Sequence, residues 1–178
     1  LEQNKSNREL FVMDIDGQNK KQITCTPESE GNGVWIDGGK QIAYLSGKSG
    51  DSQLWIMNAD GSNARQISYH EKGVHGFLFS PDEKHILFIG NVKYSEKASD
   101  LYPDLDKATG RVIDDLMYKH WDEWVEEIPH PYIASFDGKQ LTDITDIMEG
   151  EPFEAPMKPF GGIEQLSWSS DSKQIAYT

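Results

Sequence analysis

The stretch WIDGGKQIAY at residues 35–44 has two further versions in this chain, FSPDEKHILF at 79–88 and WSSDSKQIAY at 168–177. A second unit alternates with it, as LFVMDIDGQNKKQIT at 10–24, LWIMNADGSNARQIS at 54–68 and PYIASFDGKQLT at 131–142. Leu10 and Leu54 are 44 residues apart, as are Trp35 and Phe79. A fixed period of this size, with two strand-like units in each copy, is typical of β-propeller blades.

Each unit is predicted to be a hairpin. Asp-Gly lies between two apolar runs at 16–17, 60–61 and 137–138, where Gly accepts a positive φ and Asp caps the turn. The other unit turns at 37–39, 81–83 and 170–172 before entering IAY or ILF, which is typical of a strand between neighbouring blades. Asp14 and Asp16 also resemble part of a calcium loop, but the spacing lacks the bidentate Glu, so a turn is favoured.

The repeats therefore predict an all-β fold, a partial β-propeller of about three four-stranded blades. The expected order is a half blade at 8–24, a blade at 35–68, a blade at 79–145 with an insertion at 91–130, and a half blade at 166–178. Closed propellers have about 4–8 blades, so an arc of this size leaves strand edges open. Either the chain is a piece of a longer protein, or a homodimer completes a six-bladed ring by pairing 166–178 of one copy with 8–24 of the other.

The composition excludes several classes of protein. The net charge is −13, from 30 acidic and 17 basic residues, and no basic cluster is present to bind nucleic acid or an anionic membrane surface. A cationic ligand, including the amino terminus of a peptide, remains compatible with this charge. No run of about 18 apolar residues predicts a membrane span, and the single Cys25 excludes an internal disulfide. The chain opens on Leu1, which indicates a mature or trimmed chain.

The insertion breaks the repeat and is the candidate functional region. Its apolar residues recur at spacings of three and four, which predicts a short amphipathic helix over 112–126. An irregular or hairpin conformation is the alternative, because aromatic residues favour strands. The candidate substrate-binding residues are Tyr118, His120, Trp121, Trp124, Glu126 and Glu127.

These residues allow two interpretations. Trp121 and Trp124 form either a packing face or the aromatic wall of a site, and the carboxylates form either a solvated face or a site for a substrate ammonium. His120 and His130 lack a third ligand at metal spacing, so neither a metal nor a cofactor is expected. No G-x-S-x-G motif and no Gly-rich phosphate loop occur, so no catalytic residue is assigned and the chain alone is predicted to be inactive.

The repeats resemble the WD-like repeats of TolB-type propellers and of the N-terminal propellers of the prolyl oligopeptidase family. The insertion separates the two groups. MYKHWDEWVE at 117–126, followed by HPYI at 130–133, is similar to the acylaminoacyl-peptidase and dipeptidyl peptidase V branch.

The resemblance implies a parent serine exopeptidase, in which the propeller gates and positions peptide substrates for a C-terminal α/β-hydrolase domain that carries the Ser-Asp-His triad. In the related dipeptidyl peptidase IV branch, a Glu-Glu pair in a propeller insertion binds the substrate amino terminus. Glu126-Glu127 is similar in composition, although Ile128-Pro129 departs from that pattern. The resemblance also implies a periplasmic or secreted location. The alternative is a TolB-like periplasmic protein-binding propeller without enzymatic activity.

Overall fold

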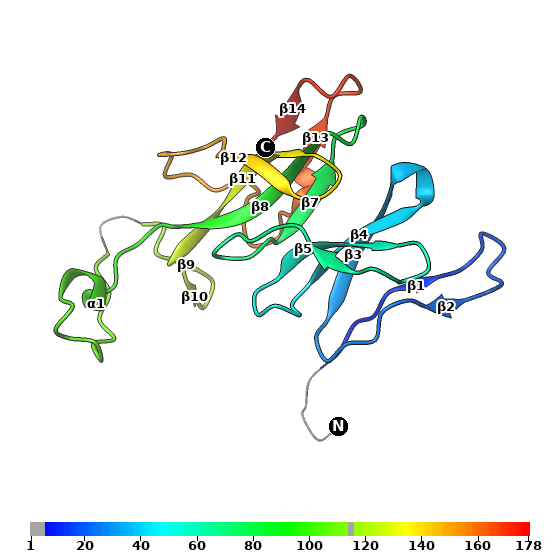
Figure 1. The fold of residues 1–178 in the computed structure, drawn as a ribbon. Coiled ribbons are helices and arrows are strands. Elements are labelled where there is room, and N and C mark those ends of the chain that lie inside the picture. The colour runs from blue at the N-terminus through cyan, green and yellow to red at the C-terminus, as the bar shows by residue number, and fades with distance from the viewer. Residues whose placement is uncertain (1–5, 114–115) are drawn as a thin grey trace.

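The computed structural model of the protein describes residues 6–113 and 116–178 (Figure 1). Two four-stranded antiparallel sheets form its centre. The first contains, in order, β3 (Glu30–Ile36), β4 (Gln41–Ser46), β5 (Gln53–Asn58) and β6 (Arg65–Gln66). The second contains β7 (Gly76–Phe79), β8 (His85–Lys93), β11 (Glu127–Phe136) and β12 (Leu141–Asp146). In both sheets each strand pairs with the next of that sheet along the chain, as in a propeller blade.

A two-stranded sheet lies at each end of this pair. One contains β1 (Phe11–Val12) and β2 (Lys21–Gln22), and the other contains β13 (Leu166–Trp168) and β14 (Ile175–Tyr177). The four sheets follow one another in chain order, from β1–β2 to β13–β14 (Figure 1). The predicted all-β partial propeller is confirmed.

The hydrophobic core lies between the sheets. The largest cluster joins the two four-stranded sheets, and Leu54, Ile56 and Ile86 within it are fully buried. A second cluster packs the β1–β2 hairpin on the first sheet, and a third packs β13–β14 on the second. Because each sheet buries its faces against its neighbours in the series, the apolar residues of one repeat are stabilised by the next.

Hydrogen bonds in the turns repeat with the sequence. The carboxylates of Asp16, Asp60 and Asp137 each accept a hydrogen bond from the backbone N–H two residues later, at 2.7–2.9 Å. The glycine that follows each aspartate has a positive φ between +83° and +91°, which a side chain would strain. The Asp-Gly signal in the sequence therefore predicted a turn, and the structure has one at each of the three places.

The insertion differs from its predicted conformation. The helix predicted over 112–126 is wrong for the described residues of that segment, which contain β9 (Lys119–His120) and β10 (Glu123–Trp124) instead, while a four-residue helix, α1, spans Ala98–Leu101. Trp121 begins the turn between β9 and β10 with a φ of +54°. A short helix needs its apolar face packed, but the side chains of Leu116 and Trp121 are 93% and 73% exposed. Local spacing alone was therefore a poor guide here, and the hairpin alternative fits the residues described.

Candidate functional site

Hairpin β8–β11 extends beyond the second sheet and carries the insertion. Its strands pair continuously, residues 85–93 with residues 127–135. Beyond the last pair, the backbone N–H groups of Tyr94 and Ser95 both donate to the carbonyl of Glu126, at 2.9 and 3.3 Å. The two ends of the insertion are therefore held together at its base, where the side chains of residues 126 and 127 lie.

The carboxylate of Glu126 binds two cations of the insertion. Lys97 Nζ lies 2.7 Å from its Oε2, and Arg111 Nη2 lies 2.7 Å from its Oε1. These hydrogen bonds, with that from Lys97 the stronger cause, hold the pKa of Glu126 below its ordinary value. Glu126 is therefore ionised at neutral pH, and both of its charged partners belong to the insertion.

The carboxylate of Glu127 binds a residue from a different part of the chain. Lys72, in the connection between β6 and β7, places its Nζ 2.9 Å from Oε1, and Asn91 Nδ2 donates to Oε2 at 3.3 Å. The hydrogen bond from Lys72 is the main cause that lowers the pKa of Glu127, and Asn91 adds to it. Glu127 thus ties the base of the insertion to the connection between the two central sheets.

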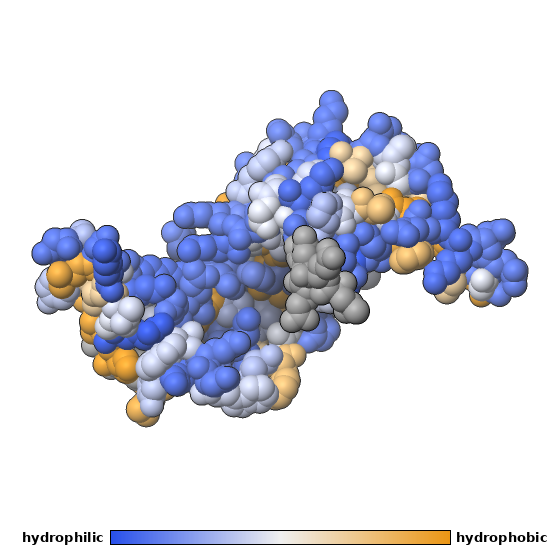
Figure 2. Space-filling view, turned by 90° about the horizontal axis from the view of Figure 1, so that it is seen from below, coloured by the Kyte–Doolittle hydropathy of each residue, from blue (hydrophilic) through white to orange (hydrophobic). Residues whose placement is uncertain are grey.

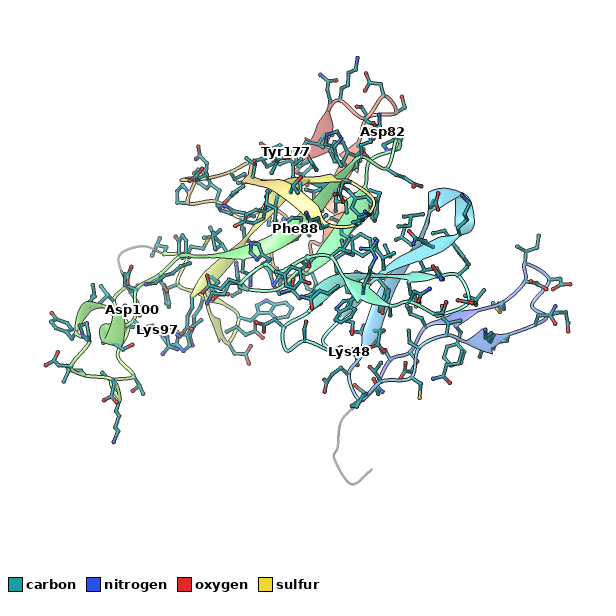
Figure 3. All side chains as sticks on the ribbon, in the orientation of Figure 1. Lys48, Asp82, Phe88, Lys97, Asp100 and Tyr177 are labelled. Carbon is teal, nitrogen blue, oxygen red and sulfur yellow. The ribbon has the colours of Figure 1, made fainter. Side chains whose placement is uncertain are left out.

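Both glutamates line one hollow of about 570 Å³, which we call the glutamate hollow. Its other lining residues include His70, Lys72, Lys97, Asp100 and Tyr132. Figure 3 shows Lys97 and Asp100 together on the insertion, well away from Phe88 in β8. Because both lysines and carboxylates line the hollow, it contains charges of both signs. Its volume lies within the range of about 300–1,000 Å³ that is usual for ligand pockets.

The aromatic candidates lie elsewhere on the insertion. Arg111 and Lys119 lie over the ring of Trp124, at 4.5 and 4.4 Å from its centroid, and Tyr118 contacts the same ring. Trp121 packs edge-on against Phe160 at 5.3 Å, and His120 Nε2 lies 3.1 Å from Glu154 Oε2. The structure therefore brings Glu126 and Glu127 into one hollow and does not bring the four other candidates into it.

Sequence reasoning missed the cations beside the two glutamates and the buried histidine of β11. Lys72 and Lys97 are far from Glu127 and Glu126 in sequence, and no motif joins them. His130 is only 2% exposed. Its position between two prolines in the apolar run IPHPYIA was the available signal, because a polar residue inside a buried strand needs a partner.

Two absences apply to residues 6–113 and 116–178. Within these ranges no group of three or more His, Cys, Asp or Glu side chains is arranged to hold a metal ion. No helix among these residues has the length and apolar character needed to cross a membrane.

Comparisons with known proteins identify related sequences. The model of the TolB beta propeller domain family matches residues 1–118. A dipeptidyl-peptidase 5 from Porphyromonas gingivalis is 56% identical over 174 residues, covering 98% of this chain and 25% of that protein. A dipeptidyl-peptidase 5 from Porphyromonas endodontalis is 42% identical, covering 99% of this chain and 26% of that protein. The chain thus spans about a quarter of the length of these curated relatives.

Solved structures share the fold. An acylaminoacyl peptidase from Pyrococcus horikoshii superposes with a TM-score of 0.57 at 13% identity, covering 82% of this chain and 21% of that one. A putative TolB from Agrobacterium tumefaciens superposes with a TM-score of 0.50 at 17% identity, covering 75% of this chain and 39% of that one. At these identities the likeness concerns the fold alone.

Proposed function

Since the chain belongs to the TolB β-propeller domain family and is a dipeptidyl-peptidase-like propeller, we propose that it gates and positions peptides for the α/β-hydrolase domain of a serine exopeptidase. The observation that carries the proposal is the extent of the 56% identity, which runs over 98% of the chain and so includes the insertion. A propeller that served only as a structural scaffold would need the repeats and no insertion. The insertion is the part that distinguishes this chain from a plain series of blades.

The geometry of the glutamate hollow supports a role in peptide binding. Glu126 and Glu127 lie side by side at the base of the insertion and line the same hollow. A peptide amino terminus is an ammonium group, and it would take the place that Lys72 or Lys97 occupies beside the carboxylates. Such an exchange replaces one charge-assisted hydrogen bond with another, so it fixes the position of the peptide rather than supplying a large net affinity.

The test uses the two-domain enzyme that contains this propeller. Glu126→Gln and Glu127→Gln are expected to raise KM for a dipeptidyl substrate by about tenfold or more, because a charge-assisted contact becomes a neutral one. The matched control is Glu123→Gln, an exposed glutamate in β10 that does not line the hollow. An unchanged KM for both test variants would assign the two glutamates to the solvated face of the insertion.

A TolB-like protein-binding propeller without enzymatic activity is the second candidate, and the matching family model favours it. The two candidates differ in what the parent gene encodes after Thr178. Further blades followed by a hydrolase with G-x-S-x-G support the peptidase, whereas a reading frame that ends after the last blade supports the binding propeller.

The edges of the two terminal sheets are the basis of a proposed homodimer. β13–β14 has the sequence of the first two strands of a blade, and β1–β2 has that of the last two. Pairing β14 of one copy with β1 of the other gives a four-stranded blade and a six-bladed ring, within the usual range of about 4–8 blades. A light-scattering mass near 20.1 kDa for the folded chain would exclude this dimer.

A periplasmic or secreted location is likewise part of the proposal, and fractionation of the source cells tests it.

A further inference from the structure

His70 lies in the connection between β6 and β7 and contacts both central sheets. Its backbone is bonded to the first sheet, because its N–H donates to Gln53 Oε1 at 3.1 Å and Gln53 Nε2 donates to its carbonyl at 2.7 Å. Gln53 is the buried first residue of β5. The ring of His70 packs on the second sheet, edge to face with Phe88 of β8 and Tyr132 of β11, at 5.6 and 4.7 Å between centroids. His70 therefore fastens one sheet to the other.

The ring occupies a recess that Gly90 provides. Gly90 belongs to β8 and pairs with His130 of β11. A Cβ at residue 90 would lie 2.7 Å from Cε1 of the His70 ring and 3.0 Å from Cε2 of Tyr132. The first distance is shorter than Cβ contacts in folded proteins, so a side chain at residue 90 and the ring of His70 exclude each other.

The ring is added to a backbone contact that also occurs one repeat earlier. Thr26 and Ser46 stand 44 residues before His70 and Gly90. The N–H of Thr26 donates to the carboxylate of Glu9 at 3.1 Å, as the N–H of His70 does to the side chain of the first residue of β5. The backbone contact is thus common to both boundaries between sheets, and the ring with its recess distinguishes the second.

The ring of His70 is packed as a neutral group. Burial is the largest cause of its pKa, which lies below the ordinary value of 6.5, and a hydrogen bond with the backbone of Gly73 and the charges of Glu71 and Asp146 act against burial. Nδ1 is buried and has no hydrogen-bond partner within residues 6–113 and 116–178. Because both ring nitrogens are donors in the cation, protonation adds a charge and leaves a buried N–H without an acceptor.

Lys72 follows His70 in the same turn. The N–H of Gly73 closes this turn by donating to the carbonyl of His70 at 3.0 Å. The amino group of Lys72 reaches from the turn to Glu127 of the second sheet, at 2.9 Å. The backbone of the turn is bonded to the first sheet, so the ring of His70 keeps Lys72 within reach of Glu127 by holding the turn against the second sheet.

We propose that His70 is an acid-sensitive latch between the two central sheets: when its ring takes a proton from the solvent, it leaves the recess at Gly90, and Lys72 separates from Glu127. His70 acts through Lys72 and is therefore a positioning residue. The proposal goes beyond the proposed function, because it concerns the contact between two blades and holds for any ligand of the glutamate hollow.

Other titratable groups lie near the ring and must be separated from it. They are Glu71, Lys72 and His75 of its own connection, Lys93 of β8, Glu127, His130 and Tyr132 of β11, and Asp146 at the end of β12. The pKa of Glu127 is lowered from 4.5 and that of Lys72 is raised from 10.5, so neither partner of the ion pair changes charge between about pH 5 and 8. His75 and His130 are the remaining histidines close to the ring, and their signals are followed individually.

The test is an NMR titration of the chain from about pH 8 to about pH 5, with labelled histidine rings and labelled lysine and glutamate side chains. Since the folded pKa of His70 is lowered, the stability of the latch is present above pH 6.5 and is lost as the pH falls toward the folded value. We expect the His70 ring to titrate with a midpoint below 6.5, and the Lys72 Cε and Glu127 Cδ signals to shift with the same midpoint. These shifts report the loss of the contact, because the two charges themselves stay constant in this range.

Three variants separate the ring from its surroundings. Gly90→Ala fills the recess and is expected to raise the His70 midpoint to about 6.5 and to place the Lys72 and Glu127 signals at their acid positions already at neutral pH. The matched control is Gly31→Ala in β3, where an added Cβ meets no atom within 4 Å, and it should titrate like the wild type. His70→Phe keeps a ring that takes no proton and is expected to remove the acid step at Lys72 and Glu127.

The proposal fails if the wild-type His70 midpoint is 6.5 or higher, or if the Lys72 and Glu127 signals stay unchanged while His70 titrates. Both results come from the wild type and do not depend on the folding of a variant. It also fails if the acid step persists in His70→Phe or follows the midpoint of His75 or His130. A failure of the proposed function appears separately, as an unchanged KM of the glutamate variants in the two-domain enzyme.

Discussion

The two central sheets have the same plan and differ in one connection. In the first sheet Tyr44 of β4 pairs with Trp55 of β5, and at the equivalent place in the second sheet Phe88 of β8 pairs with Tyr132 of β11. Residues 47–52 join β4 to β5, whereas residues 94–126 join β8 to β11. The insertion begins beyond the last pair of an extended hairpin, so the pairing within the sheet is retained. A blade of this kind tolerates an added segment at this connection because closing a longer loop costs little extra free energy.

The surfaces of the two regions differ accordingly. Figure 2 shows apolar residues at the surface at the end of the molecule that carries α1. Exposed apolar side chains of the insertion include Leu101, Leu105, Val112, Ile113 and Leu116. The two central sheets bury a cluster of apolar residues between one another, whereas the insertion leaves many of its own exposed; edge strands of the sheets also expose some, such as Phe11, Trp35 and Tyr177. Stability is therefore expected to depend on the repeats, and ligand binding on the segment that departs from them.

The largest expected effect tests this division directly. Leu54→Ala removes a fully buried side chain from the cluster between the two central sheets and is expected to lower the free energy of unfolding by about 2–5 kcal/mol. Leu116→Ala makes the same change at a side chain that is 93% exposed and is expected to have an effect within about 0.5 kcal/mol. Urea unfolding followed by circular dichroism measures both. Equal losses would show that the insertion contributes to the core as much as the blades do.

A second prediction compares one tyrosine from each sheet, the buried Tyr44 and the half-buried Tyr132. Burial, and then the charge of Glu30, raises the pKa of Tyr44 to about 12, and burial, and then the charge of Asp146, raises the pKa of Tyr132 to about 12. Each phenol is therefore more easily ionised in the unfolded chain. The stability that each contributes is fully present below pH 10.0 and is lost as the pH rises from there toward about 12.

Ultraviolet titration of phenolate absorbance checks this prediction. In the folded chain Tyr44 and Tyr132 are expected to titrate late, so Tyr44→Phe and Tyr132→Phe should each reduce the late phase. In urea this late phase is expected to disappear, because the phenols are then solvated. A late phase that survives Tyr132→Phe with full amplitude would show that the two sheets do not bury equivalent tyrosines.

The fold could be predicted from the sequence because its signals are local and repeated. Asp60 and Gly61 fix a turn within one unit, and the same dipeptide occurs in each version of that unit. Once the turns are placed, alternating apolar residues determine which strands pair. The insertion has no repeat to support it, so a spacing of three and four was interpreted as a helix although tertiary packing for it is lacking.

The site was only partly predictable for a different reason. Glu126 and Glu127 were visible as adjacent acids, but their chemistry depends on Lys72 and Lys97, which the fold brings from other segments. Likewise His130 was discounted as a metal ligand, and its actual partner, Asp146, lies at the end of a different strand. A single sequence does not indicate such pairings, because nothing in the local pattern joins the two residues.

The smallest expected effect concerns the contact that ties the insertion to the sheets. Lys72→Met removes the main cause of the low pKa of Glu127, so this pKa is expected to rise toward 4.5. Since the folded pKa of Glu127 is depressed, its contribution to stability is present above pH 4.5 and is lost as the pH falls through the folded value. The variant should therefore be slightly less stable than the wild type at neutral pH and should lose less stability on acidification below pH 4.5. Both side chains are partly exposed, so solvent screening keeps the difference well below that of Leu54→Ala.

Urea midpoints measured across the acidic range test this, with Lys107→Met as the matched loss of one exposed lysine that forms none of the ion pairs described above. If Lys72→Met and Lys107→Met follow the same pH profile, the pair with Glu127 does not hold the insertion against the sheets. The base of the insertion is then held by its other contacts, which include the backbone hydrogen bonds to the carbonyl of Glu126. If the two profiles separate below pH 4.5, the contact between Lys72 and Glu127 helps to hold the insertion against the sheets.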